Sequence, residues 1–264
     1  MLNGYMQHME RKHRSPNTIR LRLFYLTKFA ATVQDVRTAN HHDFENFIHH
    51  NLAWSQNTQQ TATASLKSFY GWAAREGILQ LNPTRDLPSI NVQRRRPRIA
   101  SEIAIHAALA CPSDTDRAMV MLGAECGLRV QEIATLNLRS RETEWLHVIG
   151  KGNHQRTLHL SPELAELLDL IEASSMRHGW YFPGRSGLQP IHVTTAWRHI
   201  TTILESNPHS LRRRAGTIVY RSSGNDIRLA QLFLGHSQST TTELYLDVQD
   251  DQLIRAGAFA RLAA

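Results

Sequence analysis

Six side chains between residues 129 and 245 could together act on a phosphodiester. In chain order they are Arg129, Lys151, His209, Arg212, His236 and Tyr245. A tyrosine oxygen can attack phosphorus while two guanidiniums hold the non-bridging oxygens through charge-assisted hydrogen bonds. A lysine can protonate the leaving oxygen, and a histidine can hold or move a proton near neutral pH. The sequence has no Walker loop, carboxylate cluster or zinc-ligand spacing that would indicate another chemistry.

Local spacing supports parts of this set, although each part alone has an ordinary structural explanation. His209 and Arg212 lie one helical turn apart, so both side chains can point at one ligand. Arg129 and Glu132 have the same spacing, which is equally that of an exposed ion pair. Lys151 stands between two glycines, as a solvent-exposed turn lysine often does. The prediction therefore depends on the ordered set.

The first ninety residues are predicted to be almost wholly helical. Apolar residues recur at three- and four-residue steps from Asn17 to about residue 30, which indicates an amphipathic helix. A short helix is expected around residues 44–48 and a longer one over 57–76. Gly77 is well placed to end the longer helix in a left-handed conformation.

A basic run over residues 91–98 predicts a boundary between two domains, 1–90 and 99–264. The arginines in the run are Arg94, Arg95, Arg96 and Arg98. In a linker that crosses DNA these side chains would meet phosphates, but a solvated loop fits the sequence equally well.

Beyond this run, helical patterns alternate with one β-like region. Residues 145–149 and 156–160 are short β-favouring runs around a Gly-Lys-Gly-Asn turn, which predicts a β-hairpin. Helices are expected over 101–110, 114–126, from Ser161-Pro162 onward, and near 190–205, 209–222, 226–234 and 239–247.

The overall composition favours a folded chain with a polyanionic partner. Its 264 residues suit one or two domains, and 30 Lys plus Arg against 23 Asp plus Glu give a net charge of +7. Nucleic acid and an anionic membrane both fit this charge. No apolar run approaches the ~18–20 residues of a membrane span, and no secretory signal is visible, so a cytoplasmic protein is expected. Cys111 and Cys126 have no metal-ligand spacing and are expected to be buried thiols.

Five motifs, in order, resemble the catalytic domain of the tyrosine site-specific recombinases, the phage integrase family. They are Gly-Leu-Arg-Val-Gln-Glu, Gly-Lys-Gly, His-Ser-Leu-Arg, Leu-Gly-His-Ser and Thr-Thr-Glu-Leu-Tyr. The resemblance spans nearly the whole chain, with less specific marks in the N-terminal part. It implies a mainly α fold, in which a helical core-binding domain precedes a mostly helical catalytic domain with a small β-sheet. It also implies a compact form without an arm-binding domain.

The resemblance assigns the central roles residue by residue. Tyr245 would be the nucleophile that forms a 3′-phosphotyrosyl link and frees a 5′-hydroxyl. Arg129 and Arg212 would bind the scissile phosphate, and Lys151 would be the general acid toward the 5′ oxygen. The covalent link stores the energy of the cut backbone, so the resemblance implies no cofactor, neither ATP nor metal.

Supporting roles follow from the same resemblance. His209 would assist as acid or base, His236 would hydrogen-bond the phosphate, and Glu132 would orient the site from behind. Arg213 and Arg214 stand where the family varies, and either contact with DNA phosphates or exposure to solvent is open for them.

The implied partners are a double-stranded DNA recombination site and further copies of the chain. Strand exchange in this family takes place in a tetramer on two paired sites. An apolar stripe near the C-terminus could dock onto a neighbouring subunit or pack within its own chain; it comprises Leu253, Ile254, Ala258, Phe259 and Leu262. An accessory directionality factor would be a further partner.

Several functions remain open at this stage. An integrase of a phage or mobile element is favoured over a host Xer-like enzyme that resolves chromosome dimers, because the stretch between His209 and Tyr245 looks more like phage forms. A catalytically inactive DNA-binding regulator with the same fold is a second class. A type IB topoisomerase would share the chemistry without a site preference.

Overall fold

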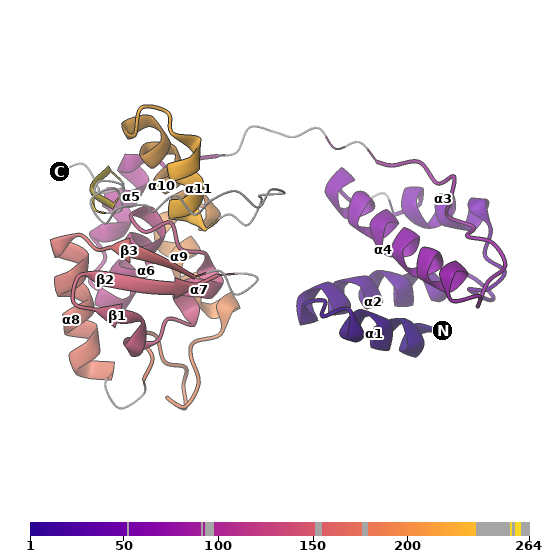
Figure 1. The fold of residues 1–264 in the computed structure, drawn as a ribbon, viewed down its shortest axis with the longest axis horizontal. Helices are drawn as coiled ribbons and strands as arrows, with labels where there is room; N and C mark the ends of the chain where they lie inside the picture. The colour runs from indigo at the N-terminus through magenta and orange to yellow at the C-terminus, as the bar shows by residue number, and fades with distance from the viewer. Residues whose placement is uncertain are drawn as a thin grey trace. The chain divides into compact units, whose positions relative to one another are not determined.

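The computed structural model describes residues 1–51, 53–90, 92, 98–150, 155–175, 179–235, 254 and 257–259. The chain divides into two compact units, Met1–Arg95 and Arg96–Ala264, and each is described by itself (Figure 1). The division falls within the basic run over 91–98. Since most of that run lies outside the described residues, the precise domain limits stay a prediction.

The first unit is helical. Its elements are α1 (Leu2–Arg11), α2 (Pro16–Ala30), α3 (His41–His49) and α4 (Gln56–Arg75). The Oγ of Ser15 accepts the backbone N–H of Thr18 at the start of α2, as expected of an N-cap. Gly77 follows α4 with φ +69°, in the left-handed region. Three helices match the predicted ones, whereas α1 was not predicted, because its N-cap residue, Met1, makes no side-chain cap hydrogen bond.

Aromatic side chains form the core of the first unit. Phe29 stacks on Phe44 with ring centroids 5.1 Å apart, and Tyr70 meets Phe44 edge-on at 5.0 Å. The Tyr70 hydroxyl donates to the Val36 carbonyl at 2.8 Å, so its polar end is satisfied although the ring is buried. This core fixes α2, α3 and α4 against one another.

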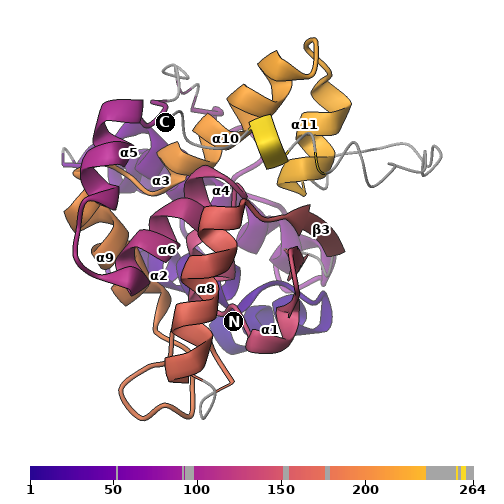
Figure 2. The same cartoon turned by 90° about the vertical axis from the view of Figure 1, so that its left-hand side faces the viewer.

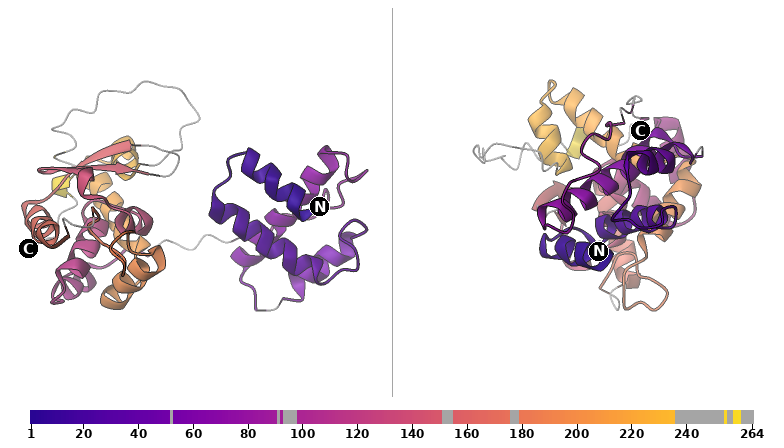
Figure 3. Two further views of the ribbon diagram at one scale, coloured as in Figure 1. Left: turned by 90° about the horizontal axis from the view of Figure 1, so that it is seen from below. Right: turned by 90° about the vertical axis from the view of Figure 1, so that its right-hand side faces the viewer.

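The second unit combines helices with one small sheet. Its elements are α5 (Glu102–Leu109), α6 (Asp114–Ala124), α7 (Val130–Ala134), the 3₁₀ turn η1 (Leu138–Ser140), β1 (Arg141–Glu142), β2 (Trp145–Ile149), β3 (Gln155–His159), α8 (Pro162–Ser175), α9 (Val193–Leu204), α10 (His209–Ser222) and α11 (Ile227–Leu234). The helix expected over 239–247 lies outside the described residues. Figure 3 shows the sheet at the edge of this unit, with the helices to one side of it.

The sheet is antiparallel in the order β1-β2-β3. Leu146 pairs with Leu158, and Val148 pairs with Arg156. These four residues are buried, so the sheet turns one face of alternating residues toward the helices. The predicted hairpin is confirmed, while the two-residue β1 is too short to leave a periodic signal.

Helix α6 lies at the centre of the second unit and packs against α5, α8, α9 and α10 (Figure 2). Gly123 lets α10 approach closely, since a Cβ built there would lie 2.9 Å from Cδ1 of Leu211. Gly127, just beyond α6, has φ +61°, and a Cβ there would lie 2.8 Å from Cδ2 of Leu234. The glycine therefore allows the end of α11 to reach the segment that precedes Arg129.

The two cysteines form no disulfide bond with each other. Cys126 is buried and Cys111 is partly exposed, and both are free thiols. Burial raises the pKa of the Cys126 thiol. Among the described residues, no helix is long and apolar enough to cross a membrane, and no group of three or more His, Cys, Asp or Glu side chains could hold a metal ion.

Candidate active site

Arg212 is buried where three segments of the second unit meet. Its side chain points inward from α10, and the residue is only 2% exposed. The guanidinium donates to the carbonyl oxygen of Gly127 and, from its other nitrogen, to the carbonyl oxygen of Leu234. Arg212 thus joins α10 to the segment before Arg129 and to the end of α11.

Arg129 precedes α7 and is held by Glu132 one turn later. Its backbone N–H donates to Oε2 of Glu132 at 2.9 Å, and its Nη1 donates to Oε1 at 2.8 Å. The Glu132 side chain is 5% exposed, whereas that of Arg129 is 32% exposed. The structure therefore excludes the exposed ion pair that the spacing also allowed. The carboxylate is buried behind an arginine that reaches the surface.

Arg156, on β3, completes this group, and the sequence analysis did not single it out. Its Nη2 donates to Oε2 of Glu132 at 2.7 Å and its Nη1 to Oε1 at 3.3 Å. Burial would raise the pKa of Glu132, but the hydrogen bonds and charges of Arg156 and Arg129 outweigh it and lower that pKa. One signal could have identified Arg156. It alternates with Leu158 on β3, so a charged residue occupies an inward-facing position that requires a partner.

His209 is the first residue of α10 and is exposed. Its backbone N–H donates to Oδ1 of Asn207 at 2.9 Å, which fixes the start of the helix. Partial burial lowers the pKa of His209, and the positive charges of Arg213, Arg212 and Arg129 lower it further. The imidazole therefore lies within the field of both predicted phosphate-binding arginines.

The cluster carries more positive than negative charge. Burial, followed by the charges of Arg129 and Arg156, lowers the pKa of Arg212 to about 9, and the carboxylate of Glu132 opposes that shift. Three guanidiniums thus share a single carboxylate in this cluster. Such an arrangement favours binding of an anion, because an added negative charge relieves the mutual repulsion of the arginines. A backbone phosphate has the charge and the acceptor oxygens for it.

The remaining catalytic predictions lie outside the described residues. They concern Lys151, His236 and Tyr245. Ile149 and Gln155 end the strands on either side of Lys151, and Gly235, before His236, follows the α11 carbonyl that Arg212 binds. The structure therefore brings Arg129, Glu132, His209 and Arg212 together and leaves the other three as predictions.

Of the predicted DNA contacts, Arg214 is wrong. It is 2% exposed, and its Nε and Nη2 donate to the two carboxylate oxygens of Glu102 at 2.8 and 2.9 Å. Its Nη1 donates to the Ala124 carbonyl at 3.1 Å. The Glu102 carboxylate neutralises the guanidinium inside the unit, whereas Arg212 bonds only backbone carbonyls among the described residues, so the charge of Arg214 is already paired and does not serve a DNA phosphate. Arg213, next to it on α10, is exposed and stays a prediction, as does exposed Arg98. Arg94, Arg95 and Arg96 lie outside the described residues.

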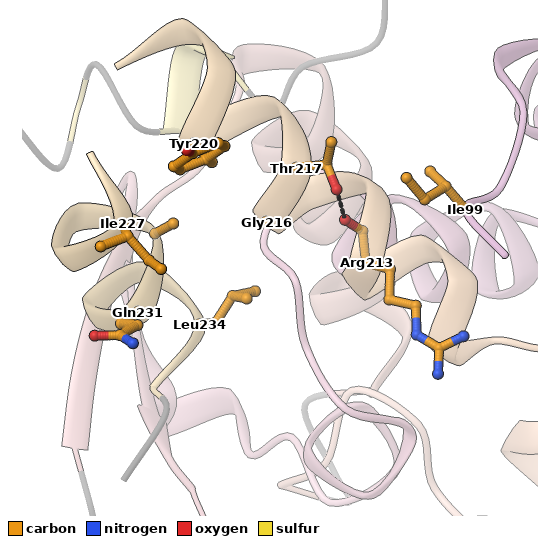
Figure 4. Close-up of a pocket in the computed structure, with 9 residues that line it drawn as sticks. Ile99, Arg213, Gly216, Thr217, Tyr220, Ile227, Gln231 and Leu234 are labelled. Atoms are coloured by element: carbon orange, nitrogen blue, oxygen red, sulfur yellow. Dashed lines mark hydrogen bonds between the residues drawn. The ribbon is translucent and has the colours of Figure 1, made fainter. Parts of the chain in front are cut away.

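Arg213 also lines an apolar groove of about 530 Å³ between α10 and α11. Figure 4 shows α10 on one side, α11 on the other, and the Arg213 side chain directed away from α11. Tyr220 and Ile227 contribute exposed apolar surface to this groove. It shares only Leu234 with the surroundings of Arg212, so the groove is separate from the arginine cluster.

Comparison with known protein families agrees with this arrangement. The model of the phage integrase family matches residues 99–252, and that of the phage integrase N-terminal SAM-like domain matches residues 2–77. The chain belongs to the phage integrase family. The sequence-based prediction of a tyrosine recombinase is confirmed.

Curated relatives of this tyrosine recombinase include tyrosine recombinases XerC. The one from Caldanaerobacter subterraneus subsp. tengcongensis is 31% identical over 210 residues, which cover 73% of this chain and 60% of the relative. The one from Shewanella amazonensis is 28% identical over 231 residues, or 80% of this chain and 78% of the relative.

Solved structures share the fold of this recombinase. A lambda integrase (75–356) dimer bound to a COC′ core site superposes with a TM-score of 0.74 at 15% identity, covering 94% of this chain and 98% of that one. The integrase from mycobacterium phage Brujita gives 0.56 at 23% identity, covering 100% and 93%. The predicted mainly α fold with a small sheet is therefore confirmed.

Proposed function

We propose that this tyrosine recombinase cuts and rejoins DNA at specific sites through a 3′-phosphotyrosyl link to Tyr245. The observation that carries the proposal is the group of Arg129 with the buried Arg212 and Glu132, and with His209 beside it. Two guanidiniums from distant segments converge there with an excess of positive charge. That geometry suits the two non-bridging oxygens of one scissile phosphate.

The proposed cleavage step exchanges one phosphoester for another. The Tyr245 oxygen attacks phosphorus, the bond from phosphorus to the 5′ oxygen breaks, and Lys151 donates a proton to that leaving oxygen. His209 is suited to accept the phenolic proton, because partial burial and then the neighbouring arginines lower its pKa and favour the neutral imidazole. Arg129 and Arg212 stabilise the charge of the transition state. In the reverse direction, a free 5′-hydroxyl attacks the phosphotyrosine and reseals DNA.

The biological reaction we favour is integration or excision of a phage or mobile element. The fold similarity to the Brujita and lambda integrases supports it. The XerC relatives support a second candidate, host resolution of chromosome dimers. Footprinting of the protein on DNA that flanks its own gene and on the replication-terminus region separates the two. An integrase should protect a site beside its gene, whereas an Xer-like enzyme should protect one near the terminus.

The proposed partners are a duplex recombination site and further copies of the chain, acting on DNA in the cytoplasm. A lambda integrase tetramer bound to a Holliday junction shares the fold, and we propose a tetramer on two paired sites here as well. Gly257, beside the stripe residues Ala258 and Phe259, lies against its own chain, since a Cβ there would approach the His159 carbonyl oxygen to 2.8 Å. The stripe residues Ile254 and Ala258 are exposed. Docking in trans on DNA, and an accessory directionality factor, remain part of the proposal.

A nicked suicide duplex carrying the footprinted site tests the chemistry. After cleavage the short 5′-hydroxyl strand diffuses away, so the wild-type protein should accumulate covalently on the DNA. Tyr245→Phe should bind the same duplex with unchanged affinity and form no adduct. A wild-type protein that protects the site but never becomes attached would instead be a DNA-binding regulator. Relaxation of a supercoiled plasmid without the site would indicate a topoisomerase.

A further inference from the structure

Arg156 lies where the sheet meets the catalytic cluster, and the proposed chemistry gives it no role. It stands on β3 opposite Val148, and its side chain is 6% exposed. Both terminal nitrogens donate to the carboxylate of Glu132, on the face of β3 that also carries the buried Leu158. Glu132 in turn holds the backbone N–H and the guanidinium of Arg129. Arg156 is thus one step removed from a predicted phosphate-binding arginine.

The same side chain packs against Gly235, the residue before His236. A Cβ built on Gly235 would lie 3.1 Å from both Cδ and Nη1 of Arg156. Gly235 ends α11 with φ +63°, a conformation that glycine adopts at little cost. Arg212 reaches the same turn by donating to the carbonyl of Leu234. Two arginines from different elements therefore fix the end of α11.

From these contacts we propose that Arg156 is a positioning residue of the recombinase. It holds Glu132 in the orientation that aligns Arg129, and it supports the turn at Gly235 from which the chain continues to His236. The proposal rests on the function proposed above. It adds a residue that links the two sides of the phosphate site without touching the phosphate.

A role as simple core filler explains this arginine poorly. Burial of a guanidinium is costly, and apolar residues of similar volume often replace buried ion pairs without loss of stability. Moreover, Nε of Arg156 is buried without a hydrogen-bond partner among the described residues. Glu132 already has Arg129 as a counter-ion, so charge neutralisation alone does not call for a second arginine. Arg156 adds a bidentate pair of hydrogen bonds that fixes the plane of the Glu132 carboxylate.

The test is the single-turnover rate of covalent attachment to the suicide duplex, measured from preformed protein–DNA complexes. Only folded, bound protein contributes to that rate. We expect Arg156→Gln to lower it by about 10- to 100-fold, since a displacement of about 1 Å at a catalytic group can cost about 100-fold. Affinity for the duplex should change by less than about threefold. Arg156→Lys, which restores the charge and one hydrogen bond, should recover part of the rate.

Two comparisons separate positioning from general damage. Arg141, on β1 of the same sheet, is similarly buried and bonds Asp169 and Glu172 away from the cluster, so Arg141→Gln should attach at the wild-type rate. Because Arg156 is proposed to act through Glu132, Arg156→Gln should add less than about threefold to the loss caused by Glu132→Gln.

Opposite results would overturn the proposal. Arg156→Gln attaching at the wild-type rate, or losses that multiply in the double variant, would show that Arg156 does not act through Glu132. Equal losses in the Arg141 and Arg156 variants would show general damage. Absence of the adduct from the wild-type protein would refute the proposed function instead, so the two failures are distinct.

Discussion

A single carboxylate, Glu132, organises the cluster at the scale of residues. It is the one acidic group among Arg129, Arg156 and Arg212 in the described part of the site, and two of those arginines bond it directly. Its removal leaves guanidiniums that repel each other. Substitution of Glu132 should therefore lower both the free energy of unfolding, through repulsion among the arginines, and the rate of catalysis, through loss of the alignment of Arg129.

Glu132→Gln tests that statement. Breaking a buried ion pair by removing one partner typically costs roughly 3–5 kcal/mol. Arg129 can be solvated, but the buried Arg156 would lose the carboxylate that both its terminal nitrogens bond, so we expect a loss within that range in chemical denaturation. Attachment to the suicide duplex should fall by at least about 10-fold. The matched control is Glu144→Gln. The Glu144 carboxylate is 68% exposed beside His159, so this substitution should change the free energy of unfolding by less than about 0.5 kcal/mol.

The pH dependence of stability provides a second check on Glu132. Its folded-state pKa is lowered from an ordinary value of 4.5. A lowered carboxyl pKa contributes stability that is present above the unfolded value and is lost as the pH falls through the folded value. Denaturation of the wild-type protein should therefore become easier below about pH 4.5. Glu132→Gln should show a smaller loss over the same interval, and an identical loss would contradict the assignment.

His209 should titrate below the ordinary value of 6.5 in the free protein. Partial burial and the charges of three arginines cause this shift, of which Arg213 is the most easily removed because it is exposed. NMR titration of the imidazole signals measures it. Arg213→Gln should raise the midpoint, and binding of a DNA phosphate should raise it further. If neither Arg213→Gln nor DNA binding shifts the midpoint, the charges of the arginines do not act on His209.

The residue scale also shows how far the sequence could lead. The grouping of Arg129, His209 and Arg212 was predictable from their types and order, and their catalytic roles stay predictions. The role of Arg156 was not predictable, because it depends on contact with Glu132. That residue lies on another element and contacts Arg156 only in the folded chain. Arg214 was misassigned for a related reason. Charge suggests DNA, whereas the helical phase of α10 turns Arg212 and Arg214 inward and Arg213 outward.

At the scale of elements, glycines set how closely helices approach the cluster. The helices themselves were predictable from apolar periodicity and N-cap residues. One such residue is Ser113, which precedes α6 and accepts the backbone N–H of Asp116 at its Oγ. The contacts between helices were not predictable in the same way. The contacts among α6, α10 and α11 depend on the space that Gly123 leaves for Leu211 and that Gly127 leaves for Leu234.

Gly127→Ala should disturb that approach. An alanine in the left-handed region costs about 1–2 kcal/mol, and its Cβ would also collide with Leu234, adding roughly 1–3 kcal/mol of overpacking. Gly224 is a matched control in the same unit, because it has φ +74° and nothing within 4 Å of its Cβ position. Chemical denaturation should show Gly224→Ala losing only the conformational part. Equal losses at the two positions would remove the packing argument.

At the scale of the whole molecule, two compact units are joined through a basic run in a chain of net charge +7. Neither the helical pattern nor the cluster says what the four arginines of residues 91–98 contact. The sequence could identify the run but not its partner, since a run of arginines is equally compatible with contact to DNA phosphates and with exposure to solvent.

Salt dependence resolves the role of that run. Each phosphate neutralised contributes about −0.9 to the slope of log K against log salt. Replacing Arg94, Arg95, Arg96 and Arg98 by glutamine should flatten the slope by about 0.9 for every arginine that pairs with a phosphate. DNA-binding titrations at several salt concentrations measure it. An unchanged slope would assign the run to solvent.

The bond between Arg214 and Glu102 has a practical consequence for anyone who isolates the second unit. Glu102 stands only a few residues beyond the basic run, yet its carboxylate receives the guanidinium of the helix that carries His209 and Arg212. A shortened protein that starts after Glu102 would lose that anchor and report weakened catalysis for a reason unrelated to DNA. Truncations meant to measure what the N-terminal unit contributes should therefore begin no later than Arg98.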